Sequence, residues 1–210
     1  MAELGSYVKK FESGEKGPSV VSWDRTGGTS YGTYQFSSLQ GGLGDFLDWA
    51  NRKGGELGAQ LFKIMLRYRP WNTGSSSGAP VLQWKQFAQL NNGKDLHKLE
   101  YGHMFDRMVE ALENKNLIPE IRSLIKSNRA LQEAWWSTVV QHGPSGACTV
   151  FKQAYAINHK SLKEYLQAIY DVRATKFGSS TAAVRKAVQS RFKEEVVVVT
   201  KLLNDEPIKI

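Results

Sequence analysis

Apolar residues recur at the three- and four-residue spacing of amphipathic helices along most of this chain. This spacing predicts helices over residues 4–11, 43–50, 57–65, 81–88, 101–112, 119–125, 131–142, 147–154, 161–173 and 180–203. Glycine or proline ends several of these segments, as at Gly54-Gly55, Arg69-Pro70 and Gly143-Pro144. The run Val196–Val199 resembles a strand, but the 3.6-residue period on both sides of it favours a helix. The pattern therefore predicts a mainly α protein.

A polar interval near the front interrupts the helical pattern. Residues Val20–Trp23 are predicted to form a strand and Thr29–Phe36 its return, with a turn over Asp24–Gly28 between them. The glycine- and serine-rich segment 71–79 is interpreted as a surface loop rather than a domain linker. We therefore expect a single domain over residues 1–210, of the α+β class, with a helical body and a small β-hairpin near the N-terminus.

The net charge and its distribution along the chain limit the kinds of binding partner that we expect. A chain of 210 residues suffices for one compact domain, and its formal charge of +8 indicates an anionic partner. Because the basic residues are spread along the chain, they fit peptidoglycan and its acidic polymers, and we expect no nucleic-acid partner. No apolar run approaches the ~20 residues of a membrane helix, so stable membrane insertion is not expected. We expect a monomer, and the single cysteine, Cys148, excludes an internal disulfide.

Glu12 is the first candidate for catalysis. It lies at the edge of the apolar stripe that Leu4, Val8 and Phe11 form on the first predicted helix. A carboxyl group in that position is partly desolvated, which favours its protonated form, the state that a general acid needs. Asp24 in the hairpin turn supplies a second carboxylate. Two carboxylates on opposite sides of one groove are typical of enzymes that cleave glycosidic bonds.

These residues carry a resemblance. Glu12-Ser13 at a helix end, a polar turn, and then Ser-Tyr-Gly-Thr-Tyr-Gln over residues 30–35 resemble the lysozyme-like superfamily, in particular soluble lytic transglycosylases and goose-type lysozymes. Asp24-Arg25 before a glycine pair is similar to the turn of the goose-type enzymes, and the Glu, Asp and hydroxyl order is similar to phage lysozymes. Goose-type enzymes often carry a further Asp after the Gln, whereas Ser37-Ser38 follow here, so the identity of the second carboxylate stays open.

The resemblance implies a lysozyme-like fold and an enzyme that cleaves the β-1,4-linked glycan strands of bacterial peptidoglycan, as a lysozyme (muramidase) or a lytic transglycosylase. Glu12 would be the general acid. If Asp24 is catalytic, we expect an inverting hydrolase, whereas a transglycosylase would need Glu12 alone. Asp24 also has an adequate structural explanation as a turn residue. The alternatives are a chitosanase- or chitinase-like glycosidase, and a basic helical nucleic-acid-binding module.

Four hairpin residues are expected to contact the substrate: Ser30, Tyr31, Tyr34 and Gln35, of which Gln35 is the best match to the family. In a regular strand Ser30 and Tyr34 lie on one face, and Tyr31 and Gln35 lie on the other. Such a strand cannot turn both pairs into one groove, so some of these residues are structural.

Trp136 and Gln141 are a second pair of candidate substrate contacts. Trp135 and Trp136 point about 100° apart on a helix, so one can line a groove while the other packs in the core, although core packing suits both. Cys148 is expected to be a buried, inert thiol. The four histidines lack the spacing of a zinc site, and no metal or cofactor is expected.

The N-terminus has no basic head followed by an apolar core, so no signal peptide is predicted. An enzyme of this kind is made in the cytoplasm and reaches the cell wall by another route. A phage endolysin released by a holin, a virion-associated enzyme and a bacterial effector secreted by its own route would all show this combination.

Overall fold

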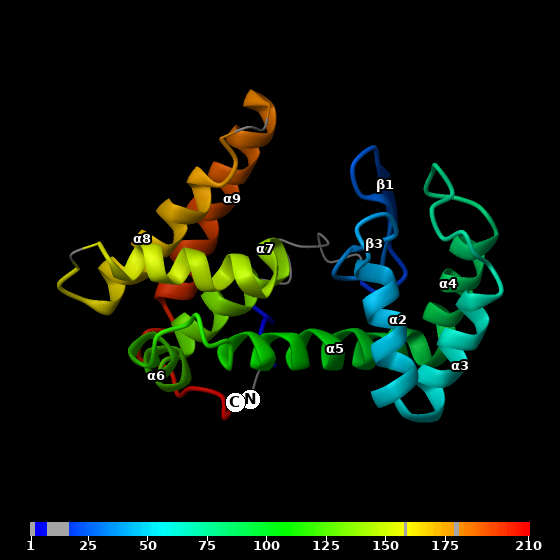
Figure 1. Ribbon diagram of the computed structural model, residues 1–210, viewed down its shortest axis with the longest axis horizontal. Coiled ribbons are helices and arrows are strands. Elements are labelled where there is room, and N and C mark those ends of the chain that lie inside the picture. The colour runs from blue at the N-terminus through cyan, green and yellow to red at the C-terminus, as the bar shows by residue number, and fades with distance from the viewer. Residues whose placement is uncertain (1–2, 8–16, 158, 179–180) are drawn as a thin grey trace. The chain divides into compact units, whose positions relative to one another are not determined.

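The computed structural model describes residues 3–7, 17–157, 159–178 and 181–210 (Figure 1). The packing of the chain divides it into two compact units. Unit 1 comprises Met1–Phe11 with Asp106–Ile210, and unit 2 comprises Glu12–Phe105. Each unit is described by itself, and the expectation of a single domain over 1–210 stays a prediction.

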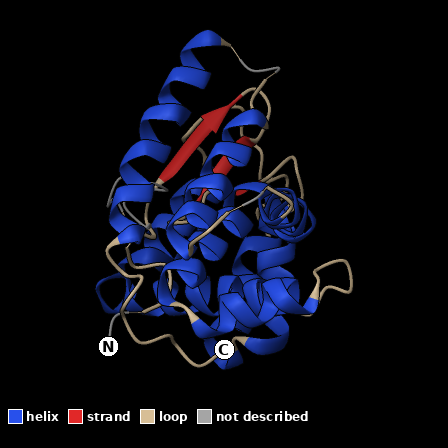
Figure 2. Ribbon diagram, turned by 90° about the vertical axis from the view of Figure 1, so that its left-hand side faces the viewer, coloured by secondary structure: helices blue, strands red, loops and turns tan. Residues whose placement is uncertain are grey.

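Unit 2 contains the predicted hairpin. Strands β1 (Val21–Asp24) and β2 (Gly28–Tyr31) pair antiparallel, and β3 (Phe36–Ser37) adds to the far side of β2. The resulting three-stranded sheet has the order β1-β2-β3 and is drawn in red in Figure 2. The sequence predicted one long return strand, but a turn at residues 32–35 divides it into β2 and β3.

The helices of unit 2 follow the hairpin. They are α2 (Gly42–Lys53), α3 (Gly55–Leu66), α4 (Ala79–Gln89), the short 3₁₀ helix η1 (Leu90–Gly93), and the first part of α5 (Lys94–Leu112). Each agrees with a predicted helix or helix end. Asn91 and Asn92 take φ angles of 49° and 54°, which separates α4 from α5 between the predicted helices 81–88 and 101–112.

Aromatic rings fasten the sheet to these helices. Phe36 of β3 stacks on Phe46 of α2 with ring centroids 4.5 Å apart, and Tyr31 of β2 meets the edge of Trp84 of α4 at 5.4 Å. All four side chains are buried. Such pairs contribute about 0.5–1.5 kcal/mol each beyond the area that they bury. The sheet is therefore held against α2 and α4 by its own core residues.

The loop of residues 71–78 is also attached to the sheet. The Thr29 hydroxyl donates to the Ser75 carbonyl at 3.0 Å and accepts from the Thr73 amide at 3.0 Å. The Tyr31 hydroxyl donates to the Trp71 carbonyl at 2.6 Å. The loop of residues 71–78, which has no regular pattern in the sequence, is thus hydrogen-bonded to β2.

Helix α5 buries part of the apolar stripe predicted from Tyr101, Phe105, Met108 and Leu112, since Met108 and Leu112 are fully buried. Tyr101 and Phe105 are only partly buried, whereas Glu100 and His103 are buried in unit 2. The His103 ring is surrounded by the rings of Phe36, Phe46 and Trp49. The prediction was incomplete in the first half of the helix because polar residues occupy part of the buried face, and periodicity alone assigns such residues to the surface.

Unit 1 is helical in its described part. It contains α6 (Pro119–Ser127), α7 (Arg129–Tyr155), α8 (Leu162–Thr175) and α9 (Ala182–Thr200). Gly143 leaves the helical conformation at φ 68° and ψ 174°, so α7 is bent at the predicted Gly-Pro break. The Ser161 hydroxyl caps α8 by accepting from the Glu164 amide at 3.2 Å, and residues 196–199 are helical as predicted.

Glu133 joins α7 to the N-terminal residues of unit 1. Its Oε1 accepts from the Gly5 amide at 3.0 Å and from the Arg129 guanidinium at 2.6 Å, and the side chain is fully buried. Burial raises the pKa of Glu133 from 4.5 to about 7, although Arg129 acts in the opposite direction. The folded protein therefore binds a proton at Glu133 more tightly than the unfolded chain does.

The free energy of unfolding should consequently fall as the pH rises from 4.5 to about 7, because only the folded protein keeps the Glu133 proton in this window. The change is at most about 3 kcal/mol. Glu133→Gln stays neutral at every pH and should flatten this part of the profile. Urea unfolding at several pH values measures the slope, with the exposed Glu110→Gln as a control. An unchanged slope in Glu133→Gln would contradict the assignment.

Candidate functional site

The hairpin has two chemically different faces. Ser22 pairs with Ser30, and Asp24 pairs with Gly28. Residues that lie opposite each other in an antiparallel pair point to the same side, so Ser22, Asp24 and Ser30 share one face. Val21, Trp23, Thr29 and Tyr31 share the other face by the same rule. Three of the polar side chains that suit sugar recognition are thus gathered on one side of the sheet.

Gln35 joins this polar face because the strand ends before it. After Tyr31 the chain turns through residues 32–35, and Gln35 takes the left-handed conformation at φ 52°. Its Nε2 donates to the Gly32 carbonyl at 2.8 Å, and its Oε1 accepts a hydrogen bond from the Ser22 hydroxyl. The alternation expected of a regular strand is wrong here, since the turn brings Gln35 to the same face as Ser30.

Asp24 begins the hairpin turn. Its Oδ1 accepts from the Thr26 amide at 2.8 Å and from the Gly27 amide at 2.7 Å, which is the turn role that the sequence allowed. The side chain is exposed, and its Oδ2 has no hydrogen bond to any described residue. A Cβ atom on Gly27 would lie 3.0 Å from this Oδ2 and 3.6 Å from the Ser30 hydroxyl. The turn therefore fixes the orientation of the Asp24 carboxylate through one of its oxygens.

Glu100 supports the turn that positions Gln35. The carboxylate is fully buried on α5, and its Oε1 accepts from the Thr33 amide at 3.0 Å. Gly32 sits at φ 77°, and a Cβ there would lie 1.8 Å from the same oxygen. Only glycine leaves room for this contact. Sequence analysis missed Glu100 because its partner is 67 residues away; the available signal was the glycine directly after the strand.

The two tyrosines of the motif have structural surroundings. Tyr31 is fully buried, and burial raises the pKa of its hydroxyl to about 12. Tyr31 packs in the core of unit 2, so it does not face the polar side of the hairpin. Tyr34 is partly buried, with its ring 6.2 Å from that of Phe36.

Glu12, the predicted general acid, lies outside the described residues, and its role stays a prediction. Of the other predicted site residues in unit 2, the structure brings together Asp24, Ser30 and Gln35. Ser22 completes this set, and sequence analysis did not single it out. We call Ser22, Asp24, Ser30 and Gln35 the polar hairpin face.

Trp136 and Gln141 belong to unit 1. Trp136 is 1% exposed and lies against Gly5, so it packs in the core, the alternative that the sequence left open. Gln141 accepts through Oε1 from the Arg173 guanidinium at 2.8 Å. Both side chains make these contacts inside unit 1.

Arg173 organises a buried polar network on the same side of α7. It donates to Glu195 Oε1 at 3.0 Å and to the Ser137 hydroxyl at 2.9 Å, and the Arg173 and Glu195 side chains are fully buried. Tyr170 donates to Glu195 at 2.9 Å. A buried ion pair needs such additional partners to offset the loss of hydration. We interpret this network as structural, since the terminal nitrogens of Arg173 bind Glu195, Ser137 and Gln141, although the buried Arg173 Nε has no partner among the described residues.

Two further groups of unit 1 are unsuited to catalysis at neutral pH. Burial lowers the pKa of His142 to about 4, with a further contribution from Arg173. Cys148 is buried, and burial raises its pKa, in agreement with an inert thiol. Within the described residues no group of three or more His, Cys, Asp or Glu side chains could hold a metal ion. No described helix is long and apolar enough to cross a membrane.

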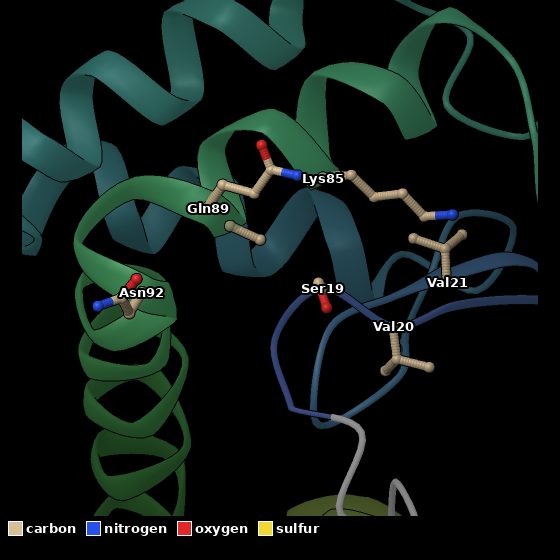
Figure 3. A pocket seen from close by; sticks show the side chains of 7 residues that line it. Ser19, Val20, Val21, Lys85, Gln89 and Asn92 are labelled. Atoms are coloured by element: carbon tan, nitrogen blue, oxygen red, sulfur yellow. The ribbon is translucent and has the colours of Figure 1, made fainter.

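A groove of about 780 Å³ lies beside β1 within unit 2 (Figure 3). One side is formed by the chain entering β1, and the other by α4 and η1. The lining residues are Ser19, Val20, Val21, Lys85, Ala88, Gln89 and Asn92. The groove therefore adjoins the strand that carries Ser22 and Asp24.

Comparison with solved structures agrees with this fold. A chain from a structure titled "Chitosanase complex structure" superposes with a TM-score of 0.57 at 15% identity, covering 92% of this chain and 88% of that one. The mainly α fold with a small sheet near the N-terminus is thus confirmed, and it is consistent with the lysozyme-like fold that the sequence predicted. At this identity the likeness defines the fold class.

The family follows from the sequence itself. Residues 4–196 match the family model of the type VI secretion system spike protein VgrG3-like, C-terminal region. Because the match covers most of the chain, the protein belongs to this family. The search of curated proteins finds no match.

The contact between Gly32 and Glu100 can be tested with a matched pair of substitutions. Gly32 and Gly41 have similar φ angles, 77° and 82°, but a Cβ on Gly41 would meet nothing within 4 Å. Gly41→Ala should lose about 1–2 kcal/mol of stability through backbone strain alone. Gly32→Ala should lose clearly more, because its methyl group also collides with Glu100 and Trp84. Chemical denaturation of both variants measures the difference, and equal losses would contradict the proposed support.

Proposed function

We propose that this protein is a glycosidase that cleaves the β-1,4-linked glycan strands of bacterial peptidoglycan. The main support for the proposal is the polar hairpin face, where an exposed carboxylate, Asp24, is held by the turn on the same side of the sheet as Ser22 and its partner Gln35. Carboxylates of this kind act as base or nucleophile in glycoside cleavage. The fold shared with a chitosanase supports the same class of reaction.

Peptidoglycan is the preferred substrate on electrostatic grounds. Chitosan is a polymer of glucosamine whose amino groups become cationic, and a chain with a formal charge of +8 is repelled by such a polymer. Peptidoglycan carries carboxylates, so the same charge attracts it. A chitosanase activity remains the second candidate because of the structural likeness. A nucleic-acid-binding module has no comparable support.

The mechanism follows from the roles of two carboxyl groups. Glu12 protonates the glycosidic oxygen of the departing sugar as general acid. Asp24 activates a water molecule on the opposite face of the sugar, which gives inversion. Gln35 holds sugar hydroxyl groups, whereas the predicted contact Ser30 is only 6% exposed and supports this face of the sheet. In the transglycosylase alternative the sugar's own hydroxyl replaces water, and Asp24 has only its turn role.

The description of the family also suggests how the protein reaches the cell wall. It names a type VI secretion system spike protein, which favours secretion as a bacterial effector over release by a holin or delivery by a virion. In this proposal the protein reaches the cell wall of a target cell together with the secretion spike. Lysozyme-type cleavage of that wall then weakens the target cell.

Glu12→Gln tests the general acid. The substitution keeps the size of the side chain and removes the proton, so turnover on purified peptidoglycan should fall by about 10²–10⁴-fold. Glu3→Gln, in the same N-terminal part of the chain, serves as the control for an unrelated charge change. Clearing at the wild-type rate by a folded Glu12→Gln protein would exclude Glu12 as the general acid.

Asp24→Asn tests the second carboxylate. Asn keeps the oxygen that accepts from the Thr26 and Gly27 amides, so the turn should survive. Turnover should fall by about 10²-fold or more, because water activation is lost. Asp48→Asn on the exposed side of α2 is the control. Mass spectrometry of the products distinguishes reducing ends from 1,6-anhydro ends; full activity with anhydro ends would favour the transglycosylase.

A further inference from the structure

The groove beside β1 combines an apolar floor with polar ends. Val20 and Val21 contribute from the strand side and Ala88 from α4, whereas Gln89 and Asn92 supply carboxamide groups at one end (Figure 3). A site of this composition suits a ligand with both aliphatic and amide groups. Sugar rings, which stack on aromatic faces, find no aromatic side chain among the lining residues.

Lys85 gives the groove its charge. Its side chain extends from α4 toward Val21, and no acidic residue lines the groove (Figure 3). Among the described residues, no carboxylate forms an ion pair with the Lys85 ammonium group. An anionic group on a ligand would therefore meet an unopposed positive charge at this position.

The outer edge of β1 offers backbone hydrogen bonds along the same groove. The Gly32 amide donates to the Val20 carbonyl at 2.8 Å, so the bonded pairs of this ladder are Val20 with Gly32 and Ser22 with Ser30. In an antiparallel ladder the residues between bonded pairs turn their amide and carbonyl groups outward. The backbone groups of Val21 and Trp23 therefore face away from β2, at an edge that no described strand covers.

We propose that this groove binds the acidic peptide substituent of peptidoglycan, with Lys85 pairing with a peptide carboxylate and the β1 edge hydrogen-bonding the peptide amides. The peptide has the required chemistry, namely alanine methyl groups, amide bonds and free carboxylates. Exposed strand edges bind extended peptides in this way. This inference rests on the proposed function. In it, the groove recognises the peptide, which is the part of peptidoglycan that an unsubstituted glycan lacks.

The geometry of β1 connects the two sites. Ser22 and Asp24 point to the polar hairpin face, whereas Val21 and Trp23 point to the opposite face. A glycan on the polar hairpin face would need a peptide that crosses only the edge of one strand to reach the groove. Three or four extended residues span roughly 10–14 Å, or two to three times the ~4.8 Å spacing of neighbouring strands. Trp23, 45% exposed at the same edge, supplies an apolar surface along the way.

Lys85→Glu is the direct test. We compare kcat/KM on intact peptidoglycan strands with kcat/KM on strands from which an amidase has removed the peptides. The wild-type protein should prefer the intact strands, and Lys85→Glu should reduce this preference about three- to tenfold, because an attractive charge becomes repulsive. Lys63→Glu, an exposed lysine on α3, makes the same charge change outside the groove and should keep the preference.

Binding of a soluble peptide separates this inference from the proposed function. The probe is the tripeptide L-alanyl-γ-D-glutamyl-meso-diaminopimelate, titrated into the full chain and followed by NMR shifts of Val21, Ala88 and Gln89. Shifts at these residues that become weaker in Lys85→Glu would support peptide binding in the groove. This holds even if neither polymer is cleaved, because the absence of cleavage would contradict only the glycosidase proposal. Cleavage with an equal preference in wild-type and Lys85→Glu proteins, or no shifts at the groove, would overturn the peptide site.

Discussion

The hydrogen bond from the Thr33 amide to the buried Glu100 carboxylate is the constraint on which the candidate site depends. A buried carboxylate is unfavourable unless polar groups compensate for its lost hydration, and the turn after β2 supplies one of them. Gly32 makes the approach possible, because any larger residue would collide with the carboxylate. The position of this turn determines the orientation of the Gln35 side chain. A residue in the interior of unit 2 thus determines which side chains lie together on the surface of the hairpin.

The two faces of the hairpin have different roles: one packs against the rest of unit 2, and the other carries side chains that are exposed to solvent. Thr29 and Tyr31 hold the sheet to the loop of residues 71–78 and to α4, so their hydroxyl groups are used inside the protein. Ser22 and Asp24 on the other face remain exposed. A strand with one side anchored in this way can present a carboxylate in a defined orientation without burying it. That arrangement suits a base that must contact both substrate and water.

Unit 1 uses polar groups differently. Arg173, Glu195 and Gln141 satisfy one another in the interior, and burial keeps His142 uncharged at neutral pH. Gln141, a candidate substrate contact in the sequence, is here one of the polar residues that join α7 to α8. Their charges confer specificity on how these helices pair, since an arrangement that separated Arg173 from Glu195 would leave a buried charge without its partner.

The sequence by itself determined the local features: the amphipathic helices, the breaks at glycine and proline, the hairpin, and the placement of Asp24 in its turn. These depend on neighbouring residues, whose spacing is visible in the chain. The resemblance of residues 12–35 also identified the fold class correctly. Only the tertiary structure decided which polar residues are buried. Glu100 and Thr33 are 67 residues apart, and Gln141 and Arg173 are 32 apart, so no local pattern reveals that they are partners. Burial of a polar group becomes favourable only when a distant part of the chain completes its hydrogen bonds, as Trp71 does for Tyr31 and Thr33 does for Glu100.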